Sequence, residues 1–377
     1  MAKVLMLLSN PYRPDPRVRR EAKALAGGGH QVTIAAWDRK GEKAPYEKDG
    51  PVQITRFGPH NDPKGAAAMA KGLPKFWKNV KKWALHQEWD VIHAHDFDTL
   101  PLGLKIGKKK KLPVLYDAHE LYAEMVKEDV PGLLYKTISK KEKKNARKAD
   151  YVITVNDAIA QKIGSWEVQR VGVVMNCPAD LTPEVDDSPS LVTFPPEGFA
   201  VLYVGVLEPM RKLEDMVEGF ATGKAPGMTL YIGGYGSIKE ELEKKAGGAG
   251  SVKMLGRIPP DRVPAISREA DILIALYDPN HTNNRLGAPN KLFEAMAYGK
   301  PIIVARGSWA GEVAEKTGCG VAVEYEGDEL FSVLAKIRDN PSIKMEMGAK
   351  GLAASREQYN WWVMEKRLLD IYRELVS

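Results

Sequence analysis

The sequence has 377 residues, which is more than one hydrophobic core usually serves and suits two domains of about 150–200 residues each. Its content of 44% hydrophobic and 28% charged residues is typical of a globular protein. The net charge of +6 divides unevenly, into +11 over residues 1–180 and −5 over residues 181–377. The basic first half is therefore expected to meet an anionic partner, and charge alone leaves nucleic acid and an anionic membrane both open.

Several classes of protein are excluded by simple patterns. The longest apolar runs have the length of a strand, which excludes a transmembrane helix. A strand begins within two residues of Met1 and leaves no room for a signal peptide. The two cysteines, Cys177 and Cys319, match neither a metal site nor a disulfide framework. We therefore expect a cytoplasmic protein, with peripheral attachment to the inner face of the membrane as an added alternative.

The chain opens with a β-α-β pattern. Lys3–Leu8 is an apolar strand, a loop with Asn10 follows, a helix spans about residues 15–26, and Gln31–Trp37 is the second strand. This opening is of the Rossmann kind, but it lacks G-x-G-x-x-G, so a dinucleotide cofactor is not supported. The helix carries Arg17 at the ligand edge of the sheet, where it either belongs to a solvated face or contacts a ligand such as a phosphate.

A basic helix is expected over about residues 66–87, after the strand Val52–Phe57. Its apolar and aromatic residues fall roughly on one side, and they are Leu73, Phe76, Trp77, Val80, Trp83 and Ala84. The remaining positions hold Lys71, Lys75, Lys78, Lys81 and Lys82. Two interpretations fit: a helix that lies on an anionic membrane, or a crossover helix that packs its rings on the sheet. Both hold together if the lysine side chains extend outward.

Histidines and acids follow two further strands. Asp90–Ala94 leads into His95 and Asp96, and Leu112–Tyr116 is followed shortly by His119. Carboxyl ends of strands in an open α/β sheet are where ligands bind, so these side chains are candidates for a functional site. Asp96-x-Asp98 matches a metal motif of a different fold, but the rest of that fold's pattern is missing, and we expect no metal. The lysine runs 108–111 and 140–148 suit helix ends and solvated helix faces.

A second α/β pattern follows a break in periodicity. Residues 177–198 contain five prolines and several acids, which indicates a linker. The strand Ala200–Val204 then leads to Gly205 and to the basic pair Arg211 and Lys212. Further strands are expected at 229–232 and 252–255. The first is followed by Gly234 and Gly236, which permit close backbone approach, and the second by Arg257 and Ile258.

The stretch from Arg285 to Ile303 carries the strongest signal. A short helix is expected over Lys291–Tyr298, ended by Gly299 and Pro301, between two buried strands. Asn290 and Lys291 then lie at a helix N-terminus, which favours an anion. Glu294 supplies a carboxylate for ribose hydroxyls on the same short helix. This combination describes a site for a nucleoside diphosphate.

The block Glu294-Ala295-Met296-Ala297-Tyr298-Gly299-Lys300-Pro301 closely resembles the donor-binding signature of family 4 glycosyltransferases, which have the GT-B fold. The resemblance implies that Glu294 holds the ribose, that Arg211 and Lys212 neutralise the diphosphate, and that His119 contacts the transferred sugar. It further implies donor-binding roles for Gly205, Gly234, Gly236, Arg257, Ile258, Asn290, Lys291 and Leu292. Two positions depart from the family pattern: Leu286 replaces a glutamate and Val206 replaces an arginine.

The resemblance implies an α/β protein of two facing Rossmann-like domains with parallel sheets and a cleft between them. We expect an acceptor-side domain over 1–178 with about 359–377, a linker over 179–198, and a donor domain over 199–358. The acceptor-side candidates are Asn10, Arg17, His95 and Asp96. No nucleic-acid motif is found, so nucleic acid is not expected as a partner.

The expected reaction transfers a sugar from a nucleotide-diphosphate donor to an acceptor hydroxyl in glycan or glycolipid synthesis. The family implies retention of configuration and no metal or other cofactor beyond the donor. The expected acceptor is a glycan or a lipid-linked saccharide, and the basic first half suits an anionic membrane. Two alternatives remain open: a nucleotide-sugar epimerase of related architecture, and a protein that binds nucleotide sugars or anionic surfaces without turnover.

Overall fold

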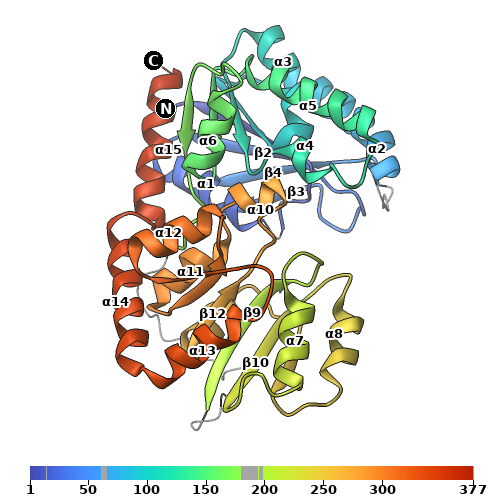
Figure 1. The fold of residues 1–377 in the computed structure, drawn as a ribbon. Helices are drawn as coiled ribbons and strands as arrows, with labels where there is room; N and C mark the ends of the chain where they lie inside the picture. Colours follow the sequence, from blue (N-terminus) through green and yellow to red (C-terminus); the bar gives the residue numbers. More distant parts are fainter. Residues whose placement is uncertain (14, 61–65, 180–193, 195–197, 377) are drawn as a thin grey trace. The chain divides into compact units, whose positions relative to one another are not determined.

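The computed structural model describes residues 1–13, 15–60, 66–179, 194 and 198–376. The chain divides into two compact units. Unit 1 comprises Met1–Met175 and Met364–Ser377, and unit 2 comprises Asn176–Val363. Most of the expected linker, 179–198, lies outside the described residues. Each unit is an α/β fold around its own sheet (Figure 1).

Unit 1 is built on an eight-stranded sheet with the order β3-β4-β2-β1-β5-β6-β7-β8. The strands are β1 (Lys3–Leu8), β2 (Gln31–Trp37), β3 (Tyr46–Asp49), β4 (Val52–Phe57), β5 (Val91–His95), β6 (Val114–Ala118), β7 (Tyr151–Thr154) and β8 (Val171–Val173). All pairs are parallel except β3 with β4. β5 and β6 are buried throughout, as expected for parallel strands whose two faces are covered. The short antiparallel edge strand β3 was not expected from the sequence.

The helices of unit 1 connect these strands. They are α1 (Pro16–Gly27), α2 (Ala66–Leu85), α3 (Asp96–Lys110), α4 (Tyr122–Met125), α5 (Gly132–Ala146), α6 (Asp157–Gly164) and the part of α15 (Trp361–Val376) from Met364 on. The chain leaves β1 for β2 on one side and reaches β5 on the other, so the strand order reverses between β1 and β5. The carboxyl ends of these strands are therefore the favoured ligand edge of the unit.

The aromatic side chains of helix α2 pack inside unit 1. Phe76 and Val80 are fully buried, and the Trp77 Nε1–H donates to the Asp98 carbonyl at 2.9 Å. The Trp83 ring lies 5.3 Å from that of Phe57. The crossover-helix interpretation is thus confirmed for the rings, while most of the lysines stay exposed. None of the helices, over the residues that the structure describes, is long and apolar enough to span a bilayer.

Unit 2 is built on a six-stranded, fully parallel sheet with the order β11-β10-β9-β12-β13-β14. The strands are β9 (Phe199–Val206), β10 (Met228–Tyr235), β11 (Val252–Gly256), β12 (Ile272–Ala275), β13 (Ile302–Ala305) and β14 (Gly320–Val323). The helices are α7 (Leu213–Ala221), α8 (Lys239–Ala246), α9 (Val263–Glu269), α10 (Thr282–Leu286), α11 (Asn290–Tyr298), α12 (Trp309–Thr317), α13 (Glu329–Asp339) and α14 (Pro341–Glu357). Here the strand order reverses between β9 and β12.

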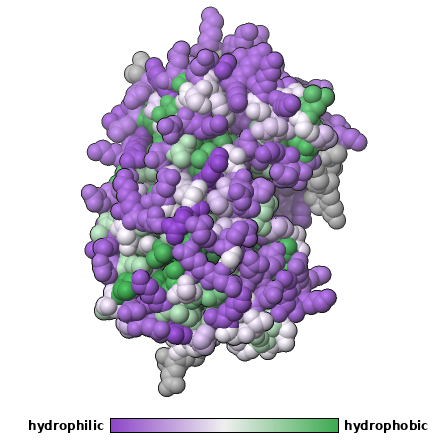
Figure 2. All heavy atoms as spheres, viewed as in Figure 1, coloured by the Kyte–Doolittle hydropathy of each residue, from purple (hydrophilic) through white to green (hydrophobic). Residues whose placement is uncertain are grey.

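The short helix expected over Lys291–Tyr298 is confirmed as α11. It begins one residue earlier and ends where expected, at Gly299, whose φ of 64° is the left-handed conformation that glycine adopts without strain. The sequence also predicts a final amphipathic helix that ends near Leu375, with Trp361 and Trp362 as core anchors, and this helix is present with Trp361 buried. The same expectation for Trp362 is wrong, because its side chain is 67% exposed. On the face shown in Figure 2, hydrophilic residues predominate and apolar ones form scattered patches.

Candidate active site

A cavity of about 410 Å³ opens at the carboxyl ends of the strands next to the reversal point of unit 2. The expected donor-binding residues that line it are Gly205, Arg211, Gly234, Ile258, Asn290, Lys291 and Glu294. The remaining lining residues are Val204, Val206, Tyr235, Pro260, Val263 and Tyr277. The sheet therefore gathers side chains that are as much as 90 positions apart in sequence. This gathering is the geometry that a ligand crevice in an open α/β sheet requires.

Lys291 and Glu294 lie one turn apart on α11 and reach the cavity together. The Lys291 Nζ donates to the Tyr277 hydroxyl at 3.3 Å and lies 4.7 Å from the centre of the Tyr203 ring. Burial lowers the pKa of Lys291, but Tyr277, Tyr203 and Glu294 outweigh it, and the net pKa is raised. Lys291 is thus a charged, mostly buried cation at the cavity wall.

Two glycines shape the wall around this lysine. A Cβ at Gly205 would stand 2.6 Å from the Lys291 Nζ, so the lysine reaches the end of β9 because no side chain is there. A Cβ at Gly234 would collide with the carbonyl oxygen of Gly205. Gly234 also has φ of 150°, which side chains rarely adopt. The glycines therefore leave the backbone of two strand ends open to a ligand.

Arg211 supplies a second cation. Its guanidinium carbon lies 4.4 Å from the centre of the Tyr277 ring. Its Nε is buried and has no hydrogen-bond partner among the described residues. A buried donor without a partner costs free energy unless a ligand atom accepts from it. Arg211 and Lys291 flank Tyr277, so the cavity has one wall suited to an anion.

The other wall of the cavity is apolar. It is formed by Ile258, Pro260 and Val263, beside the ring of Tyr235. Tyr235 is 55% exposed, and the guanidinium carbon of Arg257 lies 4.8 Å from its ring centre. A flat aromatic group held by backbone and apolar contacts fits such a wall.

Four expected donor residues do not line the cavity. The Lys212 Nζ contacts Asp215 at 3.1 Å and is buried beside Tyr325, away from the lining residues. Leu292 is fully buried in the core, because a helix turns about 100° per residue and α11 already points Lys291 and Glu294 at the cavity. Gly236 packs on the backbone of Leu207, and Arg257 lies over Tyr235. These four residues therefore lie behind or beside the lining residues and do not place a side chain in the cavity.

In unit 1 three of the four acceptor-side candidates belong to one network around the carboxylate of Asp117. The Arg17 guanidinium donates to both of its oxygens, at 2.6 and 3.0 Å. His95 Nδ1 lies 3.1 Å from Asp117, and His119 Nε2 lies 2.9 Å from it. His119 Nδ1 also contacts Asp96 at 3.2 Å. Arg17, His95 and Asp96 therefore lie in one network with His119.

The network fixes the charge of its members. Burial alone would raise the pKa of the Asp117 carboxyl, but Arg17 and His119 hold it well below its usual range. Burial alone would lower the pKa of His119, but Asp96 and Asp117 raise it to about 10. His119 is thus protonated at neutral pH, and 22% of its side chain remains exposed to reach a ligand.

Asn10 has a different position from the one expected. Its Nδ2 donates to Asp15 at 2.8 Å, and its Oδ1 accepts from the Tyr12 N–H at 2.8 Å. The nitrogen and the oxygen of this side-chain amide therefore both hold the loop between β1 and α1, since Asp15 in turn accepts from the Val18 N–H and caps α1. The structure gives Asn10 a loop-shaping role and does not place it in the network around Asp117.

Glu21, His93, His95 and Asp117 also have the spacing of a cation site, with ligand atoms within 4.8 Å of one another. The Arg17 guanidinium lies in the same cluster and contacts Glu21 at 3.1 Å as well as Asp117. This fixed positive charge balances Asp117, and burial raises the pKa of Glu21 to about 8, so that the Glu21 carboxyl is mostly neutral at pH 7. We interpret the cluster as a buried ion-pair network, and the expectation that the protein uses no metal remains a prediction.

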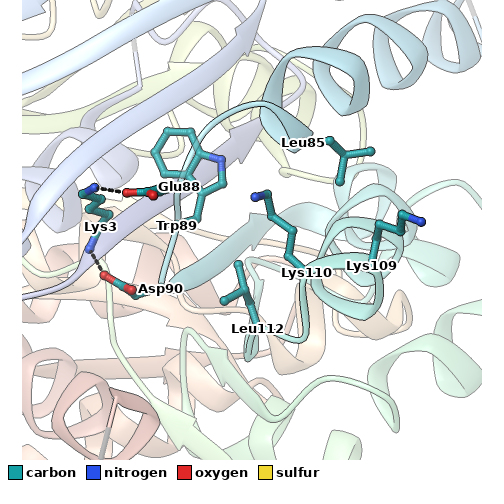
Figure 3. Close-up of a pocket in the computed structure, with 8 residues that line it drawn as sticks. All are labelled: Lys3, Leu85, Glu88, Trp89, Asp90, Lys109, Lys110 and Leu112. Carbon is teal, nitrogen blue, oxygen red and sulfur yellow. Dashed lines mark hydrogen bonds and ion pairs between the residues drawn. The ribbon is translucent and has the colours of Figure 1, made fainter.

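Unit 1 has a cavity of about 620 Å³ at the amino-terminal ends of its strands, on the sheet edge opposite the network around Asp117 (Figure 3). It is lined where β1, β5 and β6 begin, by Lys3, Asp90 and Leu112 among others. The Lys3 Nζ is paired with Glu88 at 2.8 Å, and its backbone N–H donates to Asp90. Because ligands of parallel sheets bind at the carboxyl ends of strands, this cavity is not the active site.

Comparison with known proteins decides the family. Residues 14–179 match a family model described as a glycosyl transferase 4-like domain, and residues 198–339 match one described as glycosyl transferases group 1. Together they cover most of the chain. The protein is a family 4 glycosyltransferase with the GT-B fold.

Similar proteins cover the full length of this glycosyltransferase. The phosphatidyl-myo-inositol mannosyltransferase of Mycolicibacterium smegmatis is 24% identical over 97% of this chain and 91% of its own. A sucrose-phosphate synthase from Thermosynechococcus elongatus has a TM-score of 0.83 at 19% identity, covering 99% of both chains. The Anabaena protein HepE, solved with UDP-glucose, has a TM-score of 0.71 at 16% identity, covering 100% of both. At these identities the solved structures establish the fold.

Several residues of the unit 2 cavity and of the network around Asp117 were not predicted from the sequence. Tyr203 and Tyr277 contact the cations of the unit 2 cavity. Tyr277 lies two residues after the end of β12, which was an available signal, whereas Tyr203 lies inside β9. Asp117 is the centre of the acceptor-side network, and it occurs two residues before His119 in the same strand-end block. Glu21 follows Arg17 by one helical turn, which is the spacing of an intrahelical ion pair.

Proposed function

We propose that this glycosyltransferase moves a hexose from a nucleoside diphosphate to an acceptor hydroxyl. The observation that carries the proposal is the cavity of unit 2, where two cations, one carboxylate and an apolar wall surround the same space. The diphosphate is assigned to the wall with Arg211 and Lys291. The ribose hydroxyls are assigned to Glu294, and the base to the wall with Ile258. The UDP-glucose bound to HepE supports a nucleotide sugar as the donor.

The proposed chemistry follows from these charges. As the bond between the sugar and the diphosphate breaks, negative charge grows on the leaving phosphate oxygen. Lys291 and Arg211 are held in place before the reaction, and such preorganised charges stabilise the transition state more than the ground state. The lysine is held by Tyr277 and Tyr203, so little reorganisation is needed when the charge develops.

We further propose retention of the anomeric configuration. Among the described residues that line the cavity, Glu294 is the one carboxylate, and the proposal assigns it to the ribose. A nucleophile that would form a sugar–enzyme bond is therefore not provided there. Departure of the diphosphate on the same face as acceptor attack, with the leaving phosphate taking the acceptor proton, accounts for transfer without one.

The proposed acceptor is a glycan or a lipid-linked saccharide. The mannosyltransferase of M. smegmatis is named for a phosphatidyl-inositol acceptor, and this supports a lipid-linked substrate. Incubation with a panel of labelled nucleotide sugars, with and without acceptors, tests the proposed reaction. Labelled sugar should appear on an added acceptor. Interconversion of the donor sugar would instead indicate an epimerase, and binding without product a non-catalytic protein.

Glu294→Ala should weaken binding of the donor by about 1–3 kcal/mol, because it leaves the ribose hydroxyls without their carboxylate partner. Isothermal titration calorimetry measures the change. Glu312→Ala on α12 is the matched control, since that residue is exposed and distant from the cavity lining. An unchanged affinity in folded Glu294→Ala would remove the ribose assignment.

Removal of divalent cations should leave transfer largely intact. Lys291 and Arg211 supply two positive charges beside the space assigned to the diphosphate, which is the role that a bound Mg²⁺ plays in many phosphate sites. Rates with and without excess EDTA test this. A loss of activity that added Mg²⁺ or Mn²⁺ restores would show that the two side chains are insufficient.

A further inference from the structure

Helix α5 is unusually poorly buried for a helix of 15 residues. Its only buried residues are Glu142 and Ala146. At its first turn Leu133 is 81% exposed and Leu134 is 47% exposed. Leucines this exposed on consecutive positions are uncommon on a soluble surface unless something covers them.

Lysines continue the same face of the helix. At about 100° per residue, the exposed leucines and lysines of α5 fall within an arc of about 160°, and they are Leu133, Leu134, Lys136, Lys140, Lys141 and Lys144. Glu142 and Ala146 lie on the opposite side and are buried. We call the six exposed residues the α5 surface. In Figure 2 apolar residues break the hydrophilic surface where α5 lies in Figure 1.

The acids near this surface do not cancel its charge. Glu142, the one acid of α5, points inward and accepts the backbone N–H groups of Tyr122 and Ala123 at 2.8 and 2.9 Å. Glu128 and Asp129 are exposed in the turn before α5. They face five lysines along α5 itself, so the face that carries the leucines remains basic.

The α5 surface adjoins the acceptor-side network through a short connection. Helix α4 begins three residues after His119, and its Tyr122 ring lies 5.2 Å from that of Phe97 on α3. Glu142 ties the start of α4 to α5, and the Tyr135 hydroxyl of α5 donates to Glu124 of α4 at 2.6 Å. Met125 at the end of α4 adds a further exposed apolar side chain, at 43%.

We propose that the α5 surface docks this protein on an anionic lipid bilayer, with Leu133 and Leu134 inserted among the acyl chains and the lysines at the headgroups. Exposed leucines beside a one-sided run of lysines are the composition of a helix that lies in a membrane interface. Helix α2 is basic too, but Phe76 is buried and the rings of Trp77 and Trp83 pack within the unit. The inference deepens the proposed function, since it brings a lipid-linked acceptor beside His119.

The test is flotation of the full chain with vesicles of phosphatidylcholine alone or mixed with phosphatidylglycerol. Wild type should float with the mixed vesicles at low salt and be released at high salt. Leu133→Ser with Leu134→Ser, and separately Lys140→Glu with Lys141→Glu and Lys144→Glu, should each weaken partitioning by about tenfold or more. The matched control reverses three exposed lysines of α2, namely Lys75→Glu, Lys78→Glu and Lys82→Glu, and should retain most of the binding.

Three outcomes would overturn the proposal. They are no binding of wild type to anionic vesicles, an equal loss in the α2 control, and unchanged binding in the leucine variant.

Sedimentation and a gel shift with oligonucleotides identify the other occupants. A dimer that the leucine variant dissociates would assign the surface to a second copy, and a gel shift lost only with the lysines would assign it to nucleic acid. Because flotation requires no turnover, and donor binding by unit 2 should be unchanged in every variant, failure here is distinct from failure of the proposed reaction.

Discussion

Lys291→Ala should lower the rate of transfer by about 10²–10³-fold, while binding of the nucleoside alone changes little. Lys291 is mostly buried, its pKa is raised, and its Nζ is held by the Tyr277 hydroxyl at the cavity wall. Removing one preorganised charge from the group that stabilises a developing anion costs an enzyme roughly this factor. Initial rates at saturating donor, with the donor affinity measured separately, give the two quantities.

Arg211→Ala should act in the same direction, because its buried Nε lacks a partner until a ligand accepts from it. Lys253→Ala is a matched control, as Lys253 is an exposed residue of β11 in the same unit. If Lys291→Ala reduced nucleoside and nucleoside diphosphate binding equally and spared the rate, the charge would not act on the leaving group. The assignment of the cationic wall would then be wrong.

Asp117→Asn should destabilise unit 1 by about 3–5 kcal/mol, the usual result of leaving a buried ion pair with one partner. Asp117 is fully buried and holds Arg17, His95 and His119 together. Its folded-state pKa is lowered, so this contribution is fully present above the ordinary pKa of about 4 and is lost as the pH falls through the lower folded value. Hydrogen exchange read by mass spectrometry localises the loss.

In that measurement peptides from β5 and β6 should lose protection, and those from β9 and β12 should keep it. Glu88→Gln is the control, because Glu88 forms an exposed ion pair with Lys3 in the same unit and its loss should leave protection unchanged. Full protection in Asp117→Asn would show that the Arg17–Glu21 pair alone holds the network. Asp117 would then be dispensable for the position of His119.

The sequence was sufficient for the parts of the fold that local chemistry determines. Helix α11 follows from its glycine end and from the proline two residues later, and both signals are local. The parallel strands follow from apolar runs of strand length. The edge strand β3 is polar and short, so it carries no such signal, and only its pairing with β4 makes it a strand.

Contacts between distant segments were harder to anticipate. Lys291 and Arg211 are 80 positions apart, and the tyrosine that joins them, Tyr277, is a residue type that more often packs in a core. The family pattern favoured Lys212, but the structure turns that side chain to Asp215. In unit 1 the sequence indicated His119, while its partners Asp117 and Arg17 meet it only because two strands and a helix converge.

We infer that the cavity of unit 2 binds a nucleoside diphosphate through Arg211, Lys291 and Glu294. Calorimetric titration of wild type with uridine, guanosine and adenosine, each beside its diphosphate, tests it most directly. For the base that the protein uses, the diphosphate should bind at least about tenfold more tightly than the nucleoside, because two cations face the phosphates. Equal affinity for nucleoside and diphosphate with all three bases would show that Arg211 and Lys291 do not bind the phosphates.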